Sequence, residues 1–129
     1  MNRPRLLLID DEPVLADFVA TVAADCGFDP ILTSDDRRFR ESFLEACPAM
    51  VVMDLGMPGM DGVELLRFLA GAKCDCPVLI ISGFDRRVLE SAFRLGEALG
   101  LRMIGPLEKP VFAADLEMVF NQVRPTLAS

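Results

Sequence analysis

Five short runs of apolar residues recur along the 129-residue chain, and longer stretches of mixed polarity separate them. The runs are four to six residues long and rich in Val, Ile, Leu and Met, which is typical of strands. Few polar residues interrupt them, as expected for parallel strands that helices cover on both faces. The five predicted strands are residues 5–9, 29–32, 50–53, 78–81 and 102–107.

The stretches between these runs have helical spacing of apolar residues, and Pro13 suits the start of the first helix. Alternating strands and helices indicate right-handed βαβ units and an α/β fold, a doubly wound five-stranded parallel sheet with strand order 2-1-3-4-5. We expect residues 1–129 to form a single domain, with none left for an output domain in this chain. The predicted apolar helix faces are Val14, Phe18 and Val22; Phe39, Phe43 and Leu44; Leu65, Phe68 and Leu69; and Leu116, Val119, Phe120 and Val123.

The composition excludes several classes of protein. A 52% hydrophobic content is too high for a disordered chain, and the absence of His removes Ser-His-Asp and Cys-His chemistry. With 13 Lys and Arg against 20 Asp and Glu, the net charge of −7 argues against direct nucleic-acid binding. No apolar run approaches the length of a membrane span or a signal sequence, so we expect a cytoplasmic protein without membrane insertion.

The four cysteines, Cys26, Cys47, Cys74 and Cys76, fit neither a disulfide framework nor a zinc site. The only close pair is Cys74-Asp75-Cys76, and no second pair or His accompanies it. We therefore expect reduced, structurally ordinary thiols. A redox or metal role for the Cys74–Cys76 pair stays open as the lesser alternative.

Polar residues follow four of the predicted strands. Asp10 and Asp11 end the first strand, Asp54 the third, Ser82 the fourth and Lys109 the fifth. Because parallel strands end at the same edge of a sheet, and ligands bind there, these groups are expected to share one crevice. Individually the acids could cap a helix or form a turn, Ser82 could begin a loop and Lys109 could be solvated.

Together these groups suit phosphoryl chemistry. Three neighbouring carboxylates repel one another, and a divalent cation relieves the repulsion. Hard oxygen ligands favour Mg²⁺, which shares its coordination shell with phosphate oxygens. Lys109 adds a positive charge for an anion and Ser82 a hydroxyl donor. The sequence therefore predicts a site that accepts a phosphoryl group on a carboxylate.

These residues lie in four motifs, at residues 6–12, 51–62, 80–83 and 108–110, which are similar to those of response-regulator receiver domains in two-component signalling. The resemblance covers essentially the whole chain and implies the flavodoxin-like (βα)5 fold of that family. It implies that Asp54 is the phosphoacceptor, with Asp11 and Asp54 ligating Mg²⁺ directly. Asp10 would act through water, and the Gly56 carbonyl would complete the protein ligands.

The same resemblance assigns the remaining site residues. Ser82 would bind a phosphoryl oxygen with the Gly83 N–H nearby, and Lys109 would pair with the phosphoryl group across a cis bond to Pro110. The phosphoryl donor would be a sensor histidine kinase or phosphotransfer protein. The switched surface would be formed by the fourth helix, fifth strand and fifth helix, and it would act on a downstream protein or fused output domain. Beyond its own phosphorylation and dephosphorylation, the domain would not be an enzyme.

One residue departs from the family pattern, and one segment is distinctive within it. Pro106 stands where family members usually carry a Tyr or Phe three residues before the lysine. Such a proline suits an outer strand, because it cannot donate a ladder hydrogen bond. The aromatic half of the usual switch is therefore absent. Either backbone shifts around Ser82 and the following helix transmit the signal, or the output is unconventional. Residues 95–105 resemble receivers joined to an EAL-type cyclic di-GMP phosphodiesterase domain.

Two other functions stay open. An aspartyl-nucleophile hydrolase would need a D-x-D arrangement after the first strand and a cap insertion, whereas Asp10 and Asp11 are adjacent and no long insertion occurs. A phosphorylation-independent scaffold of the same fold is the other, which Pro106 keeps open.

Overall fold

The structure of the protein, a computed structural model, describes residues 3–57, 61–83 and 85–127. In these ranges five parallel strands form one sheet in the order β2-β1-β3-β4-β5, and a helix follows each strand. The predicted fold class and strand order are confirmed. The strands are β1 (Arg5–Ile9), β2 (Asp29–Thr33), β3 (Met50–Asp54), β4 (Pro77–Ser82) and β5 (Arg102–Glu108). The helices are α1 (Pro13–Asp25), α2 (Asp36–Ala46), α3 (Gly62–Gly71), α4 (Arg86–Ala98) and α5 (Ala113–Leu127).

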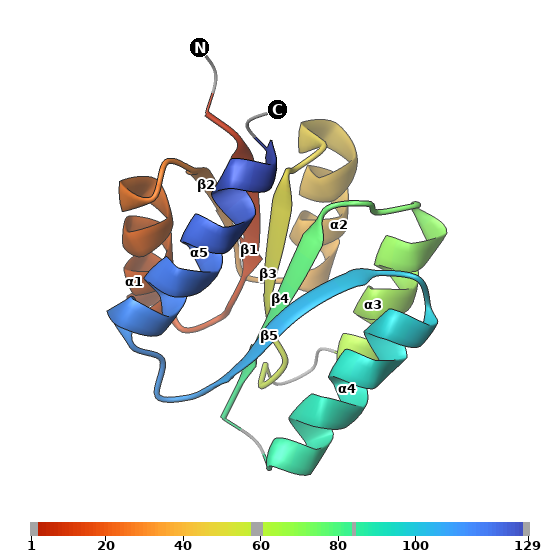
Figure 1. Ribbon diagram of the computed structural model, residues 1–129. Helices are drawn as coiled ribbons and strands as arrows, with labels where there is room; N and C mark the ends of the chain where they lie inside the picture. The colour runs from red at the N-terminus through yellow and green to blue at the C-terminus, as the bar shows by residue number, and fades with distance from the viewer. Residues whose placement is uncertain (1–2, 58–60, 84, 128–129) are drawn as a thin grey trace.

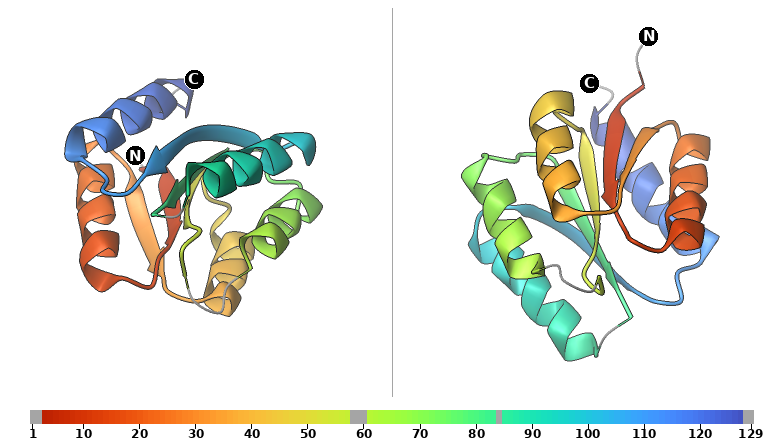
Figure 2. Two further views of the ribbon diagram at one scale, coloured as in Figure 1. Left: turned by 90° about the horizontal axis from the view of Figure 1, so that it is seen from below. Right: turned by 180° about the vertical axis from the view of Figure 1, so that it is seen from behind.

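The helices form two layers around the sheet. Helices α1 and α5 cover one face, and α2, α3 and α4 cover the other (Figures 1 and 2). Each interface holds its own apolar core, with Phe28 and Phe120 packed edge to face in the first at a centroid distance of 5.7 Å. All residues of β3 and β4 are buried, whereas the edge strands β2 and β5 are partly exposed. The apolar composition of the inner strands thus reflects burial on both faces.

Four strands extend further than the sequence pattern predicted. Thr33, Asp54, Ser82 and Glu108 are the last residues of their strands, and β4 begins one residue early, at Pro77. Apolar runs stop at the first polar residue, but the backbone ladder continues past it. The polar side chains at these strand ends are therefore held by the sheet itself.

Two predicted core positions are wrong. Val14 is 84% exposed and Leu44 is 63% exposed, although both match the helical spacing of their neighbours. Helix α1 instead buries small side chains, including Ala16, Ala20 and Ala23. Alanines on the buried face let α1 lie close to its neighbours, a property that a search for large apolar residues overlooks.

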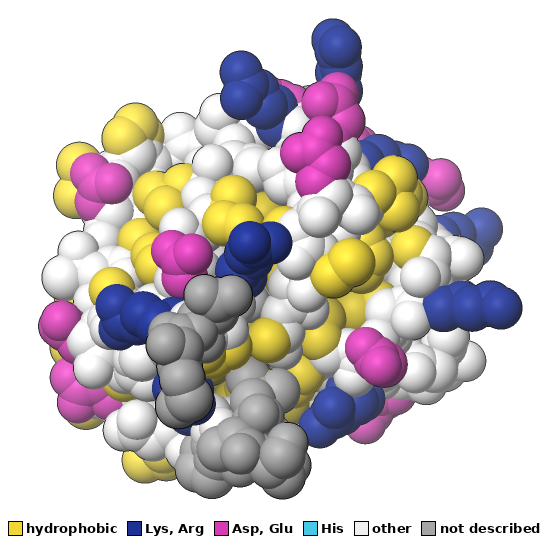
Figure 3. Space-filling model, turned by 90° about the horizontal axis from the view of Figure 1, so that it is seen from above, with side chains coloured by type: hydrophobic (Ala, Val, Ile, Leu, Met, Phe, Trp, Pro, Cys, Tyr) yellow, Lys and Arg dark blue, Asp and Glu magenta, His cyan; other side chains and the backbone are white. Residues whose placement is uncertain are grey.

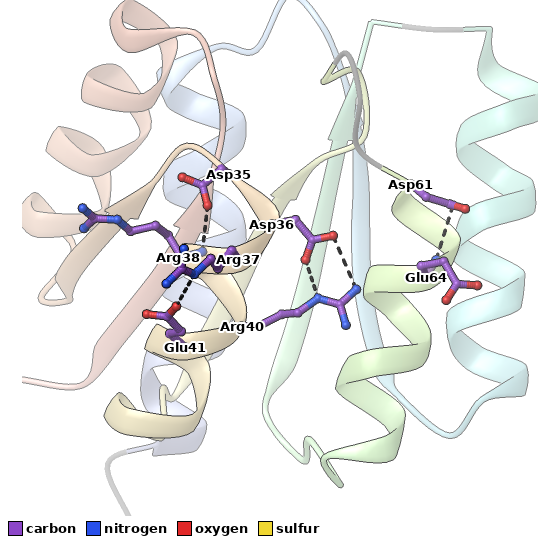
Figure 4. Close-up of polar contacts among 8 residues, drawn as sticks. All are labelled: Asp35, Asp36, Arg37, Arg38, Arg40, Glu41, Asp61 and Glu64. Carbon is purple, nitrogen blue, oxygen red and sulfur yellow. Dashed lines mark hydrogen bonds and ion pairs between the residues drawn. The ribbon is translucent and has the colours of Figure 1, made fainter.

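Side-chain caps fix the starts of α2 and α3 (Figure 4). Asp35 accepts a hydrogen bond from the Arg38 N–H at 2.8 Å, and Asp61 accepts from the Val63 N–H at 2.9 Å. Arg40, which pairs with Asp36, lies over the ring of Phe68 at 5.0 Å and so connects α2 to α3. These caps define where each helix leaves the end of the sheet that carries the polar residues.

Strand β5 is the edge strand predicted from Pro106, and its pairing with β4 is interrupted there. Gly105 and Pro106 lie opposite the single residue Ile80, which makes a bulge. The φ of Gly105 is 84°, and a Cβ on it would approach Leu79 Cδ1 to 2.6 Å, so this position strongly favours glycine. Within the described ranges, no helix is both long and apolar enough to cross a membrane.

Candidate functional site

Four carboxylates gather at the end of the sheet where the parallel strands finish. One oxygen from each of Asp10, Asp11, Glu12 and Asp54 lies within 4.8 Å of the others. The first three follow β1 directly and Asp54 ends β3, the neighbouring strand. This end is at the bottom of Figure 1 and faces the viewer in the left panel of Figure 2. The predicted convergence of Asp10, Asp11 and Asp54 is found in the structure.

The carboxylate of Asp54 is buried and held on both of its oxygens. Only 2% of the residue is exposed. Oδ1 accepts a hydrogen bond from the Gly56 N–H at 2.8 Å, and Oδ2 lies 3.0 Å from the Lys109 ammonium nitrogen. A Cβ at position 56 would lie 3.3 Å from Oδ1, so Gly56 leaves the approach to Asp54 uncrowded. The arrangement fixes the orientation of this carboxylate.

Lys109 contacts two carboxylates of the acidic cluster, Asp54 and Glu12. Its ammonium nitrogen also lies 2.8 Å from Glu12 Oε1. Burial disfavours the charge, but the hydrogen bonds to Glu12 and Asp54 outweigh it, so the pKa of Lys109 is raised. The lysine therefore stays charged. Because it contacts Asp54 as well as Glu12, it places a positive charge beside Asp54 for an anion that binds there.

The surroundings of Asp10 disfavour its charged form. It is 4% exposed, and burial together with the nearby Asp54 carboxylate raises its pKa to about 6, although the Glu12 N–H donates to it at 2.9 Å. Among the described residues, the Lys109 ammonium contacts two of the four carboxylates, Glu12 and Asp54. Their hard oxygen donors and surplus of negative charge fit a divalent cation such as Mg²⁺. We identify Asp10, Asp11, Glu12 and Asp54 as the residues available to such an ion.

Ser82 and Gly83 lie on the other side of Asp54. Ser82 is completely buried and follows Ile81, the residue that pairs with Asp54 between β3 and β4. Its carbonyl accepts from the Lys109 N–H at 2.9 Å, which connects the ends of β4 and β5. A Cβ on Gly83 would lie 3.4 Å from the Lys109 side chain, so the lysine stem packs over this glycine. The peptide bond from Lys109 to Pro110 is cis, as expected.

Glu12 is the one cluster member that was not predicted to belong to the site. The sequence placed it at the start of α1, where it is indeed the N-cap residue, but its side chain makes no capping bond. It pairs instead with Lys109, which is far away in the sequence. Its position in the run 10–12 was the only available signal. Residues 58–60 of the second motif lie outside the described residues.

A parallel five-stranded sheet that brings an oriented aspartate, a carboxylate cluster and a lysine to one end defines the class of phosphoryl-accepting signalling modules. The family described as the response regulator receiver domain matches residues 6–121, and the chain belongs to it. The resemblance stated from the four motifs is therefore confirmed.

Curated relatives are named as transcriptional regulatory proteins or as response regulators. The chain is 30% identical over 133 residues to the transcriptional regulatory protein FixJ of Bradyrhizobium diazoefficiens, an alignment that covers 99% of this chain and 62% of FixJ. It is 37% identical over 79 residues to the C4-dicarboxylate transport transcriptional regulatory protein DctD of Pseudomonas aeruginosa, covering 61% of this chain and 17% of DctD. The chain thus spans less than two thirds of the length of these relatives.

Solved structures show the same fold. A Francisella response regulator receiver domain matches with a TM-score of 0.81 at 24% identity, covering 96% of this chain and 98% of that one. A receiver domain protein from Clostridium thermocellum matches with a TM-score of 0.79 at 25% identity, covering 96% of each chain.

The expected likeness of residues 95–105 to receivers joined to an EAL-type domain is not supported, because the matched relatives are named as transcriptional regulators.

Proposed function

We propose that Asp54 is the residue that accepts the phosphoryl group. The donor is the phosphorylated histidine of a partner, a sensor histidine kinase or a phosphotransfer protein, because this chain contains no His. One oxygen of the Asp54 carboxylate attacks phosphorus. The bond from phosphorus to the donor imidazole nitrogen breaks, and that nitrogen keeps the electron pair and takes a proton from water. The product is an aspartyl phosphate on this chain.

The burial and orientation of Asp54 carry this proposal. A carboxylate held by the Gly56 N–H and the Lys109 ammonium presents a fixed nucleophile to a group that arrives from solvent. After transfer, Lys109 pairs with a phosphoryl oxygen and remains charged to do so. Ser82, at the end of the adjacent strand, supplies a hydroxyl donor to another oxygen.

The metal assignment belongs to the same proposal. Asp11 and Asp54 would ligate Mg²⁺ directly, Asp10 would act through water, and the Gly56 carbonyl would complete the protein ligands. The raised pKa of the buried Asp10 supports a cation there, since the Lys109 ammonium only partly offsets the negative charge of the cluster. When bound, Mg²⁺ supplies positive charge against the phosphoryl oxygens.

Labelling with acetyl phosphate tests the acceptor. The wild-type chain is expected to gain one acid-labile phosphoryl group in the presence of Mg²⁺ and none in excess EDTA. Asp54→Asn should abolish the mass increase. Asp61→Asn is the matched control, because Asp61 is an exposed aspartate seven residues later and asparagine also caps helices. Undiminished labelling of Asp54→Asn, or equal loss in both variants, would refute the assignment.

Phosphorylation is proposed to act on the surface of α4, β5 and α5. A cavity of about 640 Å³ already lies there, lined by residues of α4, β5, the segment before α5 and the start of α5, among them Leu89, Pro106 and Phe112. Phe112 is 62% exposed. Arg86 Nε, at the start of α4, lies 3.4 Å from Glu108 Oε1, at the end of β5. A downstream protein or a fused output domain would contact this surface.

The bulge at Pro106 shapes how the signal crosses this surface. No aromatic ring stands at position 106, so movement of Ser82 toward the phosphoryl group is transmitted through the backbone that leads into α4. Structures of the free and beryllofluoride-bound domain are expected to differ over residues 83–90. Superposition of that segment within coordinate error would count against this route.

The second candidate, a scaffold that acts without phosphorylation, is favoured only by Pro106. It predicts neither labelling nor cation uptake, so the acetyl phosphate experiment separates the two. Steady release of phosphate from monoesters over many turnovers would instead identify a hydrolase.

Under the main proposal, residues 1–129 act as one receiver domain in the cytoplasm, without direct contact to nucleic acid and without membrane insertion.

A further inference from the structure

Three cysteines lie together at the end of the molecule opposite the acidic cluster. Cys74 and Cys76 are in the connection between α3 and β4, and Cys47 is at the end of α2. All three line a pocket of about 250 Å³. Figure 3 shows this end, where hydrophobic side chains reach the surface between scattered charged ones. None of these thiols takes part in the proposed phosphoryl chemistry.

The sulfur atoms of Cys74 and Cys76 are in direct contact. Their Sγ atoms are 3.2 Å apart, and the residues are 9% and 7% exposed. Disulfide formation brings two sulfurs to about 2.0 Å, so the sulfurs must approach each other by about 1.2 Å. Backbone bonds already fix the connection, since the Cys74 N–H donates to the Leu69 carbonyl at 3.0 Å and Arg102 donates to the Asp75 carbonyl at 3.1 Å.

The two thiols are not equivalent. The hydrogen bond from the Cys76 thiol lowers the pKa of Cys74, and burial only partly opposes this effect. The same contact raises the pKa of Cys76, and burial adds to the increase. The contact between the sulfurs therefore favours a thiolate on Cys74 with the proton kept by Cys76, an asymmetry that suits an oxidisable thiol pair. The pocket gives a small oxidant a route to the pair.

We propose that Cys74 and Cys76 form a reversible redox site, oxidised by a peroxide to an intramolecular disulfide and reduced by a cellular thiol. The Cys74 thiolate attacks one peroxide oxygen, the O–O bond breaks, and the leaving oxygen takes a proton to become water or an alcohol. The Cys76 thiol then attacks the sulfur of the resulting sulfenic acid, the S–O bond breaks, and water leaves. The two sulfurs together lose two protons and two electrons to the peroxide.

A structural metal explains this cluster less well. Among the described residues, the acidic cluster is the only group of three or more His, Cys, Asp or Glu side chains with ligand atoms close enough to share an ion. Cys47 lines the pocket but does not complete such a group with Cys74 and Cys76. Two contacting sulfurs without a third ligand favour sulfur–sulfur bond formation.

Peptide mapping tests the site directly. Folded protein is treated with hydrogen peroxide, alkylated and digested with trypsin, which places the three relevant thiol environments on separate peptides. Residues 74–86 contain Cys74 and Cys76 and no other cysteine, while Cys26 and Cys47 fall on residues 6–37 and 41–67. The 74–86 peptide is expected to lose two hydrogens and resist alkylation until reduced. Cys26 should remain alkylatable.

Variants and an equilibrium measurement complete the test. Cys74→Ser should prevent the disulfide, whereas Cys47→Ser and Asp54→Asn should leave it unchanged. Because the disulfide does not depend on Asp54, a failure of the redox proposal can be told apart from a failure of the phosphoryl proposal. In glutathione buffers, the equilibrium constant for the disulfide should be roughly tenfold larger in folded than in urea-unfolded protein. An equal or smaller constant in the folded state, or a disulfide that includes Cys47, would overturn the proposal.

Discussion

Removing the charge of Asp10 is expected to stabilise the metal-free protein. Burial raises the pKa of this carboxyl from 3.8 to about 6, so the folded state binds its proton more tightly than the unfolded chain does. The contribution of Asp10 to the free energy of unfolding is therefore most favourable below pH 3.8 and is lost as the pH rises through about 6. Asp10→Asn removes the charge while its side-chain oxygen still accepts from the Glu12 N–H.

The magnitude follows from the two pKa values. At 1.36 kcal/mol per pKa unit, the variant should gain up to about 3 kcal/mol at pH 7 and about half of that at pH 5. Urea unfolding in excess EDTA at both pH values measures the difference. Asp17→Asn is the control, because Asp17 is an exposed carboxylate on α1 and its removal should change stability by less than about 0.5 kcal/mol.

Saturating Mg²⁺ should reduce the stability advantage of Asp10→Asn over the wild type. A ligand that binds only the folded state stabilises it by mass action, and Asp10→Asn weakens that ligand's site. The reasoning fails if the variant gains less than about 0.5 kcal/mol at pH 7, or if its gain does not shrink as the pH falls to 5.

Three further changes probe separate parts of the molecule. Lys109→Met removes the ammonium that competes with a cation beside Asp54, so calorimetry should show Mg²⁺ affinity rising roughly threefold to tenfold. Labelling with acetyl phosphate should fall in the same variant. An unchanged Mg²⁺ affinity would contradict this reasoning. Gly105→Ala should lower the free energy of unfolding by roughly 1–3 kcal/mol in guanidinium titrations, because φ is positive there, whereas Gly71→Ala, in open space at the end of α3, should have no destabilising effect. Asp61→Ala removes the cap of α3 and should lower stability by about 1 kcal/mol, and a neutral result would show that the cap is replaced by water.

The fold could be predicted because its determinants are local. Runs such as 50–53 and 78–81 are apolar throughout, and only a doubly covered parallel sheet buries such strands. Details of the helix faces could not be predicted in the same way. Val14 matches the helical spacing and is 84% exposed, because the docking of α1 depends on where its alanines meet α5 and the sheet.

The position of the site also followed from the sequence, but its internal contacts did not. Once the strand order is known, polar residues that end β1 and β3 must be neighbours. The sequence could not show that Glu12 turns away from capping α1 to pair with Lys109, since that choice depends on the end of β5. It was likewise silent on the contact between the sulfurs of Cys74 and Cys76.

By itself, the sequence determined the class of fold, the end of the sheet that carries chemistry and the residue types present there, because these depend on short-range patterns and on the geometry common to parallel sheets. Tertiary structure alone decided which charge pairs with which, how far Asp10 is withdrawn from water, and which thiols touch. Such properties depend on separations of a few ångströms between distant segments. Packing sets those separations, and no local pattern encodes them.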